Sequence, residues 1–363
     1  MLYKSIVRPL LFRGDPEQTH EKTLTVLAKL TPFERLLERH FAVRDERLHV
    51  RLGSLLFSNP VGLAGGFDKN GVAIKTMAGF GFGFIEIGAV TAMAQPGNPK
   101  PRLYRLPEDQ ALINRLGFNN EGAQVIADRL RRLRLNGCPR IPLGINIGRS
   151  KIVETENAVA DFLSAFDQLY SYGDFFTLNV SSPNTPQLRD LQDKSLLSGL
   201  LDAVQEKNRE LASRSGHSMK PVFVKIAPDM ELAQADDIVQ AVMAKGINGI
   251  VATNATAFLR EMLVSANKEP GGLSGKPLRP LATSFVRHLY RASGGELPII
   301  GVGGIFTAED AYEKIKAGAS AVQIYTGFVY EGPGAVKRIN QGLLRLLDRD
   351  GYTSITEAVG RGN

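Results

Sequence analysis

Short apolar segments alternate with longer amphipathic segments along most of the chain, from Arg47 to Asp348. The apolar segments are rich in Val, Ile, Phe and Gly and end at polar or Gly-rich positions, which is typical of buried parallel strands. Eight segments are therefore predicted as strands: 61–66, 82–88, 142–148, 174–180, 221–227, 249–254, 298–304 and 321–327. Apolar residues recur at helical spacing in the other segments. These predict helices over 71–79, 119–135, 156–171, 194–213, 231–245, 279–293, 307–317 and 333–348.

Eight alternating strand and helix units predict an α/β protein with the fold of a (β/α)8 TIM barrel. A doubly wound open sheet is the alternative, but it gives no purpose to an eighth strand or to a Gly-rich turn late in the chain. In a barrel, ligands bind at the loops that follow the strands. Three such connections, 90–118, 181–193 and 255–280, are longer than packing requires. We expect the functional residues there.

Residues 1–45 precede this alternation and are expected to form a helical unit of their own, with the barrel domain spanning 46–363. Asp15-Pro16-Glu17 predicts the start of one helix, and Thr31, followed by Pro32, is predicted as the N-cap of a second. The polar faces of both helices are basic and carry Lys22, Lys29, Arg35 and Arg39. Such helices either rest in the headgroup layer of a membrane or pack on the barrel as a lid.

Composition narrows the classes of ligand. The chain has 363 residues, a net charge of +7 and a single cysteine, Cys138, so an internal disulfide is excluded. No apolar run approaches the roughly 18 residues that a membrane span needs. The charge favours phosphate or anionic lipid, whereas a nucleic-acid partner is not expected, because no basic run is interleaved with aromatic residues. The histidines do not stand at strand ends, so no metal site is expected; they are His20, His40, His49, His217 and His288.

Polar side chains collect after the fourth predicted strand, in the segment TLNVSSPNTPQLRD from Thr177 to Asp190. Pro183 and Pro186 are expected to hold the intervening polar residues, among them Ser182, on a stiff loop. An ordinary Ser/Asn/Pro turn is the alternative.

Glycines at the ends of the seventh and eighth strands predict a phosphate site. The segment GVGG precedes a predicted helix start at Thr307, Ala308 and Glu309, and Tyr325-Thr326-Gly327 ends the last strand. Tight turns are the alternative reason for these glycines. Asn side chains at strand ends, together with Lys225 inside an apolar strand, favour a flat heterocyclic cofactor beside the phosphate, such as flavin mononucleotide.

Eight segments then resemble one family when read in order: LAGGFDKNG, INRLGFNN, INIG, LNVSSPNTPQLR, VKIAPD, TNAT, GGLSGKPL and GVGGI. The family is dihydroorotate dehydrogenase of the quinone-dependent class 2, and the resemblance covers the whole chain, including the N-terminal helices. It implies an FMN-dependent enzyme of de novo pyrimidine (UMP) biosynthesis that oxidises (S)-dihydroorotate to orotate and reduces a membrane quinone. It also implies a monomer bound peripherally to the anionic, cytoplasmic side of the bacterial inner membrane.

The resemblance places a catalytic base at Ser182, which would remove the C5 proton through Thr185 or water while hydride leaves C6 for flavin N5. Residues at matching positions are expected to bind substrate: Lys69, Asn114, Arg115, Leu116, Gly117, Phe118, Asn179, Asn184, Asn254 and Ala255. Others are expected to bind flavin: Gly65, Gly66, Phe67, Asp68, Lys69, Ala89, Asn146, Asn179, Lys225, Thr253, Gly275, Gly304, Tyr325 and Thr326. His20 and Arg105 are expected to border a quinone tunnel beneath the N-terminal helices.

The chain departs from the family pattern at Ala89 and Ala255, where hydroxyl residues are common. Other functions stay open at this point. A class 1 enzyme, or another flavin barrel, would use fumarate or a nicotinamide as acceptor. A flavin-free lyase or isomerase and a noncatalytic binder of phosphorylated ligands would both be colourless.

Overall fold

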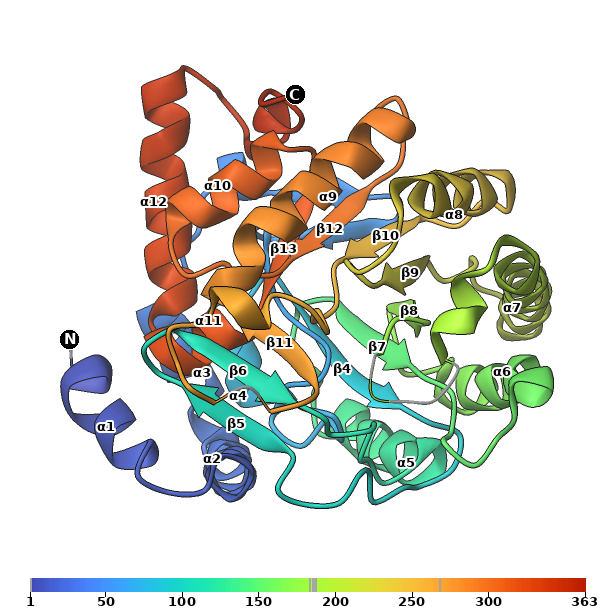
Figure 1. Cartoon of the computed structure of the whole chain (residues 1–363), viewed down its shortest axis with the longest axis horizontal. Helices are drawn as coiled ribbons and strands as arrows, with labels where there is room; N and C mark the ends of the chain where they lie inside the picture. Colours follow the sequence, from blue (N-terminus) through green and yellow to red (C-terminus); the bar gives the residue numbers. More distant parts are fainter. Residues whose placement is uncertain (1, 183, 185–187, 268) are drawn as a thin grey trace.

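The barrel predicted from the alternating pattern is present. A computed structural model describes residues 2–182, 184, 188–267 and 269–363. Eight parallel strands close in the order β10-β12-β13-β3-β4-β7-β8-β9, so the (β/α)8 prediction is confirmed (Figure 1). Most of them end a few residues before the predicted limits. The strands are β3 (Val61–Leu63), β4 (Phe84–Val90), β7 (Leu143–Ile147), β8 (Phe175–Asn179), β9 (Val222–Ile226), β10 (Gly249–Ala252), β12 (Ile299–Val302) and β13 (Ala321–Ile324).

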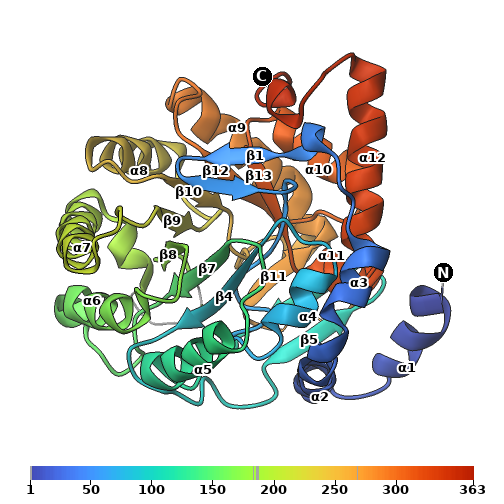
Figure 2. The ribbon, with the colours of Figure 1, turned by 180° about the vertical axis from the view of Figure 1, so that it is seen from behind.

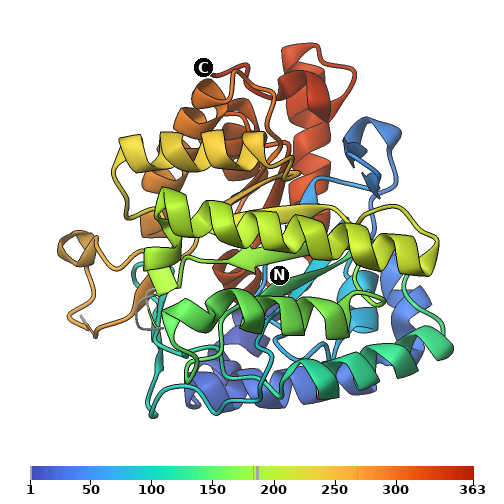
Figure 3. The same ribbon diagram turned by 90° about the vertical axis from the view of Figure 1, so that its right-hand side faces the viewer.

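A ring of helices surrounds the strands (Figures 1 and 3). Each strand is followed by one predicted helix: α4 (Ile74–Gly79), α5 (Ala123–Leu135), α6 (Ala158–Leu169), α7 (Lys194–Ser215), α8 (Leu232–Ala244), α9 (Arg279–Ala292), α10 (Ala308–Lys316) and α12 (Ala335–Asp350). A further helix, α11 (Thr326–Glu331), was not predicted, because its first turn had been assigned to the eighth strand. Short 3₁₀ turns connect the larger elements: η3 (Glu46–Leu48), η4 (Thr155–Asn157), η5 (Leu188–Gln192), η6 (Arg260–Met262), η7 (Lys276–Leu278) and η8 (Ile355–Ala358).

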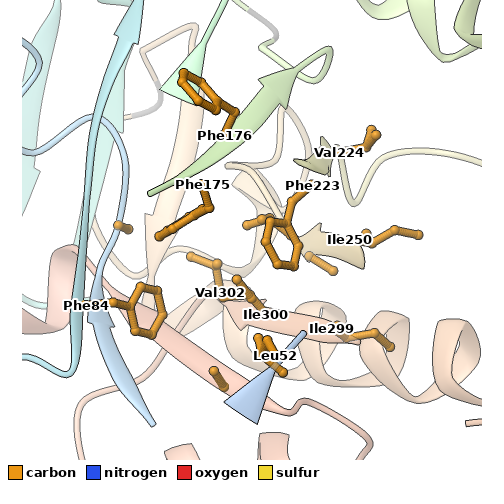
Figure 4. Packing of buried hydrophobic residues seen from close by; sticks show 14 of the residues in the cluster. Leu52, Phe84, Phe175, Phe176, Phe223, Val224, Ile250, Ile299, Ile300 and Val302 are labelled. Atoms are coloured by element: carbon orange, nitrogen blue, oxygen red, sulfur yellow. The ribbon is translucent and has the colours of Figure 1, made fainter. Parts of the chain in front are cut away.

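Phenylalanines fill the N-terminal half of the barrel interior, where glycines on neighbouring strands leave room for them. A Cβ on Gly62 would lie 2.3 Å from the ring of Phe84, and a Cβ on Gly144 would lie 2.1 Å from the ring of Phe175. Figure 4 shows these rings together with Phe223. Large residues on one strand therefore pack against glycines on the next to fill the core.

A hairpin that was not predicted closes the N-terminal end of the barrel. β1 (Val50–Leu52) pairs antiparallel with β2 (Leu55–Phe57), and this hairpin lies in front of the barrel in Figure 2, which shows the molecule from behind. The ring of Phe57 stacks on Phe84 at a centroid distance of 4.1 Å. With this end covered, the strand C-termini form the open end.

A second sheet stands beside the open end. It consists of β5 (Leu103–Leu106), β6 (Ala111–Asn114) and β11 (Gly272–Gly275), which are antiparallel in the order β11-β6-β5. These strands belong to two of the three long connections, 90–118 and 255–280. Functional residues were predicted in these connections, but the strands and their pairing were not.

The N-terminal region forms η1 (Tyr3–Val7), α1 (Arg8–Leu11), α2 (Pro16–Lys29), η2 (Thr31–Phe33) and α3 (Glu34–Phe41). The predicted start of α2 is confirmed, because the Asp15 carboxylate accepts a hydrogen bond of 2.9 Å from the backbone N–H of Gln18. The predicted N-cap at Thr31 is wrong. Leu30 before it is helical (φ −81°, ψ −1°), so α2 runs almost directly into η2. Thr31 is thus the first residue of η2 and not its N-cap, and the N-cap position is held by Leu30, which lacks the extended backbone that a side-chain cap needs.

A buried ion pair fixes α2 to the loop that precedes β5. Arg102 Nη2 lies 2.7 Å from Glu17 Oε1, and both side chains are buried. Arg102 Nη1 also donates to the backbone carbonyls of Pro96 and Asn98, each at 2.6 Å. Burial alone would raise the pKa of Glu17, but the hydrogen bonds and charge of Arg102 lower it. In the described part of the chain, no helix has the length and apolar character needed to cross a membrane.

Candidate active site

The strand C-termini and the second sheet enclose a cavity of about 1060 Å³, including its mouth. We call it the polar cavity. The structure brings the predicted catalytic serine and most of the predicted substrate and flavin residues to its lining. They are Gly65, Gly66, Lys69, Ala89, Asn114, Leu116, Gly117, Phe118, Asn179, Ser182, Asn184, Lys225, Thr253, Asn254, Ala255, Gly275, Gly304, Tyr325 and Thr326.

A fully buried carboxylate lies below this cavity. Glu86 in β4 accepts hydrogen bonds from Asn146 Nδ2 (2.7 Å), Thr177 Oγ1 (3.0 Å) and Gln323 Nε2 (2.9 Å), which come from three other strands. A buried charge requires such partners. Glu86 was missed because only strand ends were considered, although a carboxylate within the apolar segment FGFIEIG could have indicated it.

The amides above Glu86 continue this network. Asn179 Nδ2 donates to Asn146 Oδ1 at 3.0 Å, and Ser181 Oγ donates to Asn179 Oδ1 at 3.0 Å. Asn254 Nδ2 in turn donates to Ser181 Oγ at 2.9 Å. Because each amide already has a directed partner, the orientations of Asn179 and Asn254 are fixed before a ligand binds.

Two lysines contribute positive charge to the polar cavity. Lys225 is only 4% exposed and makes no hydrogen bond or ion pair with the residues that the structure describes. Its burial lowers its pKa, while the charge of Glu86 opposes this shift. Burial also lowers the pKa of Lys69 to about 8. An anionic or electron-rich ligand would compensate the cost of burying these cations.

Ser182 is buried at the edge of the polar cavity. Its hydroxyl accepts a hydrogen bond of 3.2 Å from the backbone N–H of Asn184. Within the described residues, no imidazole or carboxylate forms a hydrogen bond with this hydroxyl. Pro183, Pro186 and the expected relay residue Thr185 lie outside the described residues.

Asn184 connects the loop after β8 to the second sheet. Its Nδ2 donates to the backbone carbonyl of Asn114 in β6 at 3.2 Å, and its own carbonyl accepts from Asn98 Nδ2 at 3.3 Å. Two of the residues expected to bind substrate therefore hold each other in place.

At the end of strands β12 and β13, the glycines expected of a phosphate site line the polar cavity, but the predicted helix start does not. The N-terminus of α10 is capped by its own residues: Asp310 N donates to Thr307 Oγ1 at 3.3 Å, and the Asp310 carboxylate accepts from the N–H groups of Phe306 and Thr307. Thr307, Ala308 and Glu309 do not line the cavity. The helix that begins at the cavity is α11, with Tyr325 and Thr326 at its start.

Gly304 shows why glycine is needed at this end. Its φ is +72°, and a Cβ would lie 2.3 Å from the Cβ of Arg279. Gly303, which belongs to the segment GVGG predicted for the phosphate site, also lines the polar cavity, as do Ser274 and Gln323, which were not predicted as site residues.

Four predicted residues do not reach the lining of the polar cavity: Phe67, Asp68, Arg115 and Asn146. The Asp68 carboxylate accepts from the N–H groups of Val72 (2.9 Å) and Ala73 (2.8 Å), just before α4. Arg115 forms an ion pair of 2.8 Å with Glu269, which holds its side chain away from the cavity. Asn146 lies below the lining in the Glu86 network, and Phe67 lines a different cavity.

Two buried polar atoms of the lining have no hydrogen-bond partner among the described residues: Thr253 Oγ1 and Gln323 Oε1. Buried polar atoms are rarely left without a partner. Together with Lys225, they suit the polar edge of a flat heterocycle. Among the described residues, no group of three or more His, Cys, Asp and Glu side chains could hold a metal ion.

A second cavity of about 770 Å³ lies beneath α2 and is lined mainly by apolar side chains. We call it the apolar cavity. Both residues expected at the quinone tunnel, His20 and Arg105, line it, as do Phe67 and Phe328. The two cavities share a wall made of Leu103, Leu112 and Tyr325.

The two residues predicted for the quinone tunnel form hydrogen bonds with backbone carbonyls. His20 Nε2 lies 2.8 Å from the carbonyl of Phe67. Burial, assisted by the charge of Lys69, lowers the pKa of His20 to about 4. The imidazole is therefore neutral at pH 7, with Nε2–H as the donor. Arg105 Nη1 donates to the carbonyl of Gly14 at 2.8 Å, and its guanidinium lies 4.7 Å from the ring centroid of Phe12.

Comparison with known proteins identifies close relatives. A family model described as dihydroorotate dehydrogenase matches residues 47–347. A protein of Trichormus variabilis named dihydroorotate dehydrogenase (quinone) is 46% identical over 379 residues, covering 99% of this chain and 98% of the relative. One of the same name from Gloeobacter violaceus is 48% identical over 363 residues, covering 99% and 98%.

Among solved structures, DHODH from Eimeria tenella in complex with ferulenol is similar over 96% of both chains. The TM-score is 0.88 and the sequence identity is 36%. The ligand-free form of that enzyme gives a TM-score of 0.86 over 96% of this chain and 99% of the other.

Proposed function

Because this chain belongs to the dihydroorotate dehydrogenase family, we propose that it oxidises (S)-dihydroorotate to orotate and passes the electrons to a membrane quinone. This is a step of de novo pyrimidine (UMP) biosynthesis. The observation that carries the proposal is the wall shared by the polar and apolar cavities. A water-soluble substrate and a lipid-soluble acceptor can thereby approach one cofactor from separate compartments.

Enzymes of this family are flavin-dependent, and the polar cavity fits flavin mononucleotide. Gly304, Tyr325 and Thr326 would bind the phosphate at the start of α11, and Lys225 and Thr253 would contact the ring edge. When bound, this cofactor would supply an acceptor for hydride from C6 of the substrate and a donor of electrons to quinone. A cation at Lys225 would favour the reduced, more negative ring.

Ser182 would remove the proton from C5 of the substrate. A free serine hydroxyl is a weak base, so the reaction needs a relay that carries its own proton away, through Thr185 or water. Lys69 would pair with the substrate carboxylate, and Asn114, Asn179, Asn184 and Asn254 would hold the polar edges of the ring. The prior fixing of these amides within the chain supports the proposal, because it lowers the entropic cost of orienting the substrate.

Residues 1–45 would bind the anionic, cytoplasmic face of a bacterial inner membrane as a peripheral unit and admit quinone to the apolar cavity. Exposed apolar side chains on this unit support that role: Leu10 is 56% exposed, Phe33 54% and Leu36 63%. The basic residues Lys22, Lys29, Arg35 and Arg39 are also exposed and would face lipid headgroups. The enzyme would work there as a monomer.

An acceptor assay tests this proposal. The purified protein is expected to be yellow, to bleach when dihydroorotate is added without oxygen, and to regain its colour with a soluble quinone but not with fumarate or a nicotinamide. Recovery of colour with fumarate alone would show that the electron acceptor is a soluble compound and not a quinone. A colourless protein that flavin cannot reconstitute would exclude the whole proposal.

A further inference from the structure

Three loops at the open end of the barrel meet at Asp229, which follows β9. Its side chain is completely buried. The carboxylate accepts hydrogen bonds from Arg189 Nη2 (2.9 Å), from the backbone N–H of Ala257 (2.8 Å) and from the hydroxyl of Thr256. Arg189 belongs to the loop after β8, whereas Thr256 and Ala257 belong to the loop after β10, which projects from the barrel in Figure 3.

The first arm of this junction reaches the residue next to Ser182. Arg189 Nε donates to the backbone carbonyl of Ser181 at 3.3 Å, while Nη2 of the same guanidinium is held by Asp229. The guanidinium is planar, so the directions of its N–H groups are fixed relative to one another. Holding one side on Asp229 therefore sets the position of the Ser181 carbonyl.

The second arm reaches the same residue from the other side. Thr256 pairs with Leu273 of β11 through two backbone hydrogen bonds of 3.0 and 2.7 Å, and its hydroxyl is bound by Asp229. Two residues earlier, Asn254 Nδ2 donates to the hydroxyl of Ser181 at 2.9 Å. Both arms thus converge on Ser181, one at its carbonyl and one at its side chain.

We propose that Asp229 is a positioning residue that fixes Ser182 for proton removal, acting through Arg189 and Thr256. This inference rests on the proposed role of Ser182 as the base. Asp229 lines neither cavity, so it acts on the reaction without touching substrate or cofactor. Nothing in the sequence segment VKIAPD distinguishes this aspartate from an ordinary loop residue.

The test is a double-mutant cycle in the full-length, flavin-loaded enzyme. Asp229→Asn removes the charge but keeps the shape, and anaerobic flavin reduction by dihydroorotate is measured for Asp229→Asn, Ser182→Ala and the double variant. We expect Asp229→Asn to slow reduction on the order of 10- to 100-fold and to add no further loss in the Ser182→Ala background. Reoxidation of the chemically reduced flavin by quinone should be unchanged.

Asp237→Asn is the matched control. Asp237 forms an ion pair of 2.7 Å with Lys194, between α8 and the start of α7, and both side chains are well exposed. This variant removes a carboxylate between the same two βα units but away from the cavity, so reduction should stay at the wild-type rate.

If Asp229→Asn does not fold, Arg189→Lys takes its place in the double-mutant cycle. The lysine keeps a positive charge opposite Asp229 but cannot also donate to the Ser181 carbonyl as Nε does, so the same dependence on Ser182 is expected. Reduction at the wild-type rate in the folded variant would overturn the inference. An equal loss with and without Ser182 would also overturn it, because it would mean a purely structural role. The proposed function is judged separately, by Ser182→Ala alone: a wild-type rate there would exclude Ser182 as the base.

Discussion

The two cavities differ in how their polar groups are used. In the polar cavity, Asn179 and Asn254 are held in a network that begins at the buried Glu86, and Lys225 has no hydrogen-bond partner within the described residues. In the apolar cavity, His20 and Arg105 donate hydrogen bonds to backbone carbonyls. The first cavity presents directed donors and charge to a ligand, and the second mainly presents apolar surface.

This difference matches two kinds of chemistry. Removing a proton and a hydride from a polar ring requires groups that are oriented before the reaction begins. Binding a quinone requires a dry, apolar volume and access from lipid. The two cavities are adjacent, and Tyr325, Leu103 and Leu112 form the wall between them. Each half-reaction should therefore be separable by mutation.

Removal of residues 1–45 should have the largest effect, because it should eliminate the function of the apolar cavity and leave that of the polar cavity. The deletion removes α2 and the side chains of Tyr3, His20 and Leu27 from the apolar cavity. We expect quinone reduction to be abolished while flavin stays bound and is still reduced by dihydroorotate. Flavin content and the two half-reactions, measured separately by absorbance, check this outcome. Undiminished quinone turnover would show that the N-terminal unit does not form the acceptor site.

Ser182→Ala should impair only the half-reaction in the polar cavity. General base catalysis typically contributes roughly 10²- to 10⁴-fold, so flavin reduction by dihydroorotate at pH 7 should slow by that range in anaerobic stopped-flow measurements. Quinone should reoxidise chemically reduced flavin at the wild-type rate. Ser213→Ala, at an exposed position of α7, is the control and should change neither rate. Equal slowing of both half-reactions would contradict separate sites.

His20 should make the apolar cavity sensitive to acid. Its pKa is lowered to about 4 in the folded protein by burial, against about 6.5 in an unfolded chain. The stabilising preference for neutral His20 is complete above pH 6.5 and is lost as the pH falls towards 4, at a cost of up to about 3 kcal/mol. Unfolding free energies of wild type and His20→Gln, measured between pH 7 and pH 4.5, should show the smaller acid loss in the variant. The exposed His217→Gln should behave like wild type.

Leu36→Glu should have the smallest effect, confined to membrane binding. Leu36 on α3 is 63% exposed, and burying one leucine in lipid contributes about 1.5–3 kcal/mol. We expect roughly 10-fold weaker binding to vesicles of anionic phospholipid in a sedimentation assay. Quinone turnover in detergent should be unaffected. Leu135→Glu, at an 80% exposed position of α5, should bind vesicles like wild type.

The barrel was predictable because each of its strands carries its own local signal. Segments such as PVFVKIA and PIIGVGG are apolar throughout, since parallel strands are covered on both faces. The hairpin β1–β2 escaped because strands of three residues are too short to show a period. The second sheet escaped because it pairs Ala111–Asn114 with Gly272–Gly275, and such long-range pairing is not encoded in either segment alone.

For the site, the sequence indicated where polar groups gather but not how they are oriented. Residues at strand ends, such as Asn179 and Thr253, do line one cavity. Arg115 does not line the cavity, and its ion-pair partner Glu269 lies in a distant connection. The helix start predicted beside the phosphate, Thr307 to Glu309, does not line the cavity, and the capping box of Thr307 and Asp310 satisfies the start of α10 internally. Glu86 and Asp229 act by holding other residues, which a list of strand ends does not reveal.

Thr253 Oγ1 and Gln323 Oε1 have no hydrogen-bond partner among the residues that the structure describes, and this couples the stability of the fold to the supply of the cofactor. A cofactor that satisfies them binds only the native state, so it raises the free energy of unfolding by an amount that grows with its concentration. Cells starved of flavin should then contain less of this protein, even at constant synthesis, because the cofactor-free chain unfolds and is degraded more often. Pulse-chase half-lives in flavin-limited and flavin-supplemented cultures would measure how strongly vitamin supply sets the enzyme level.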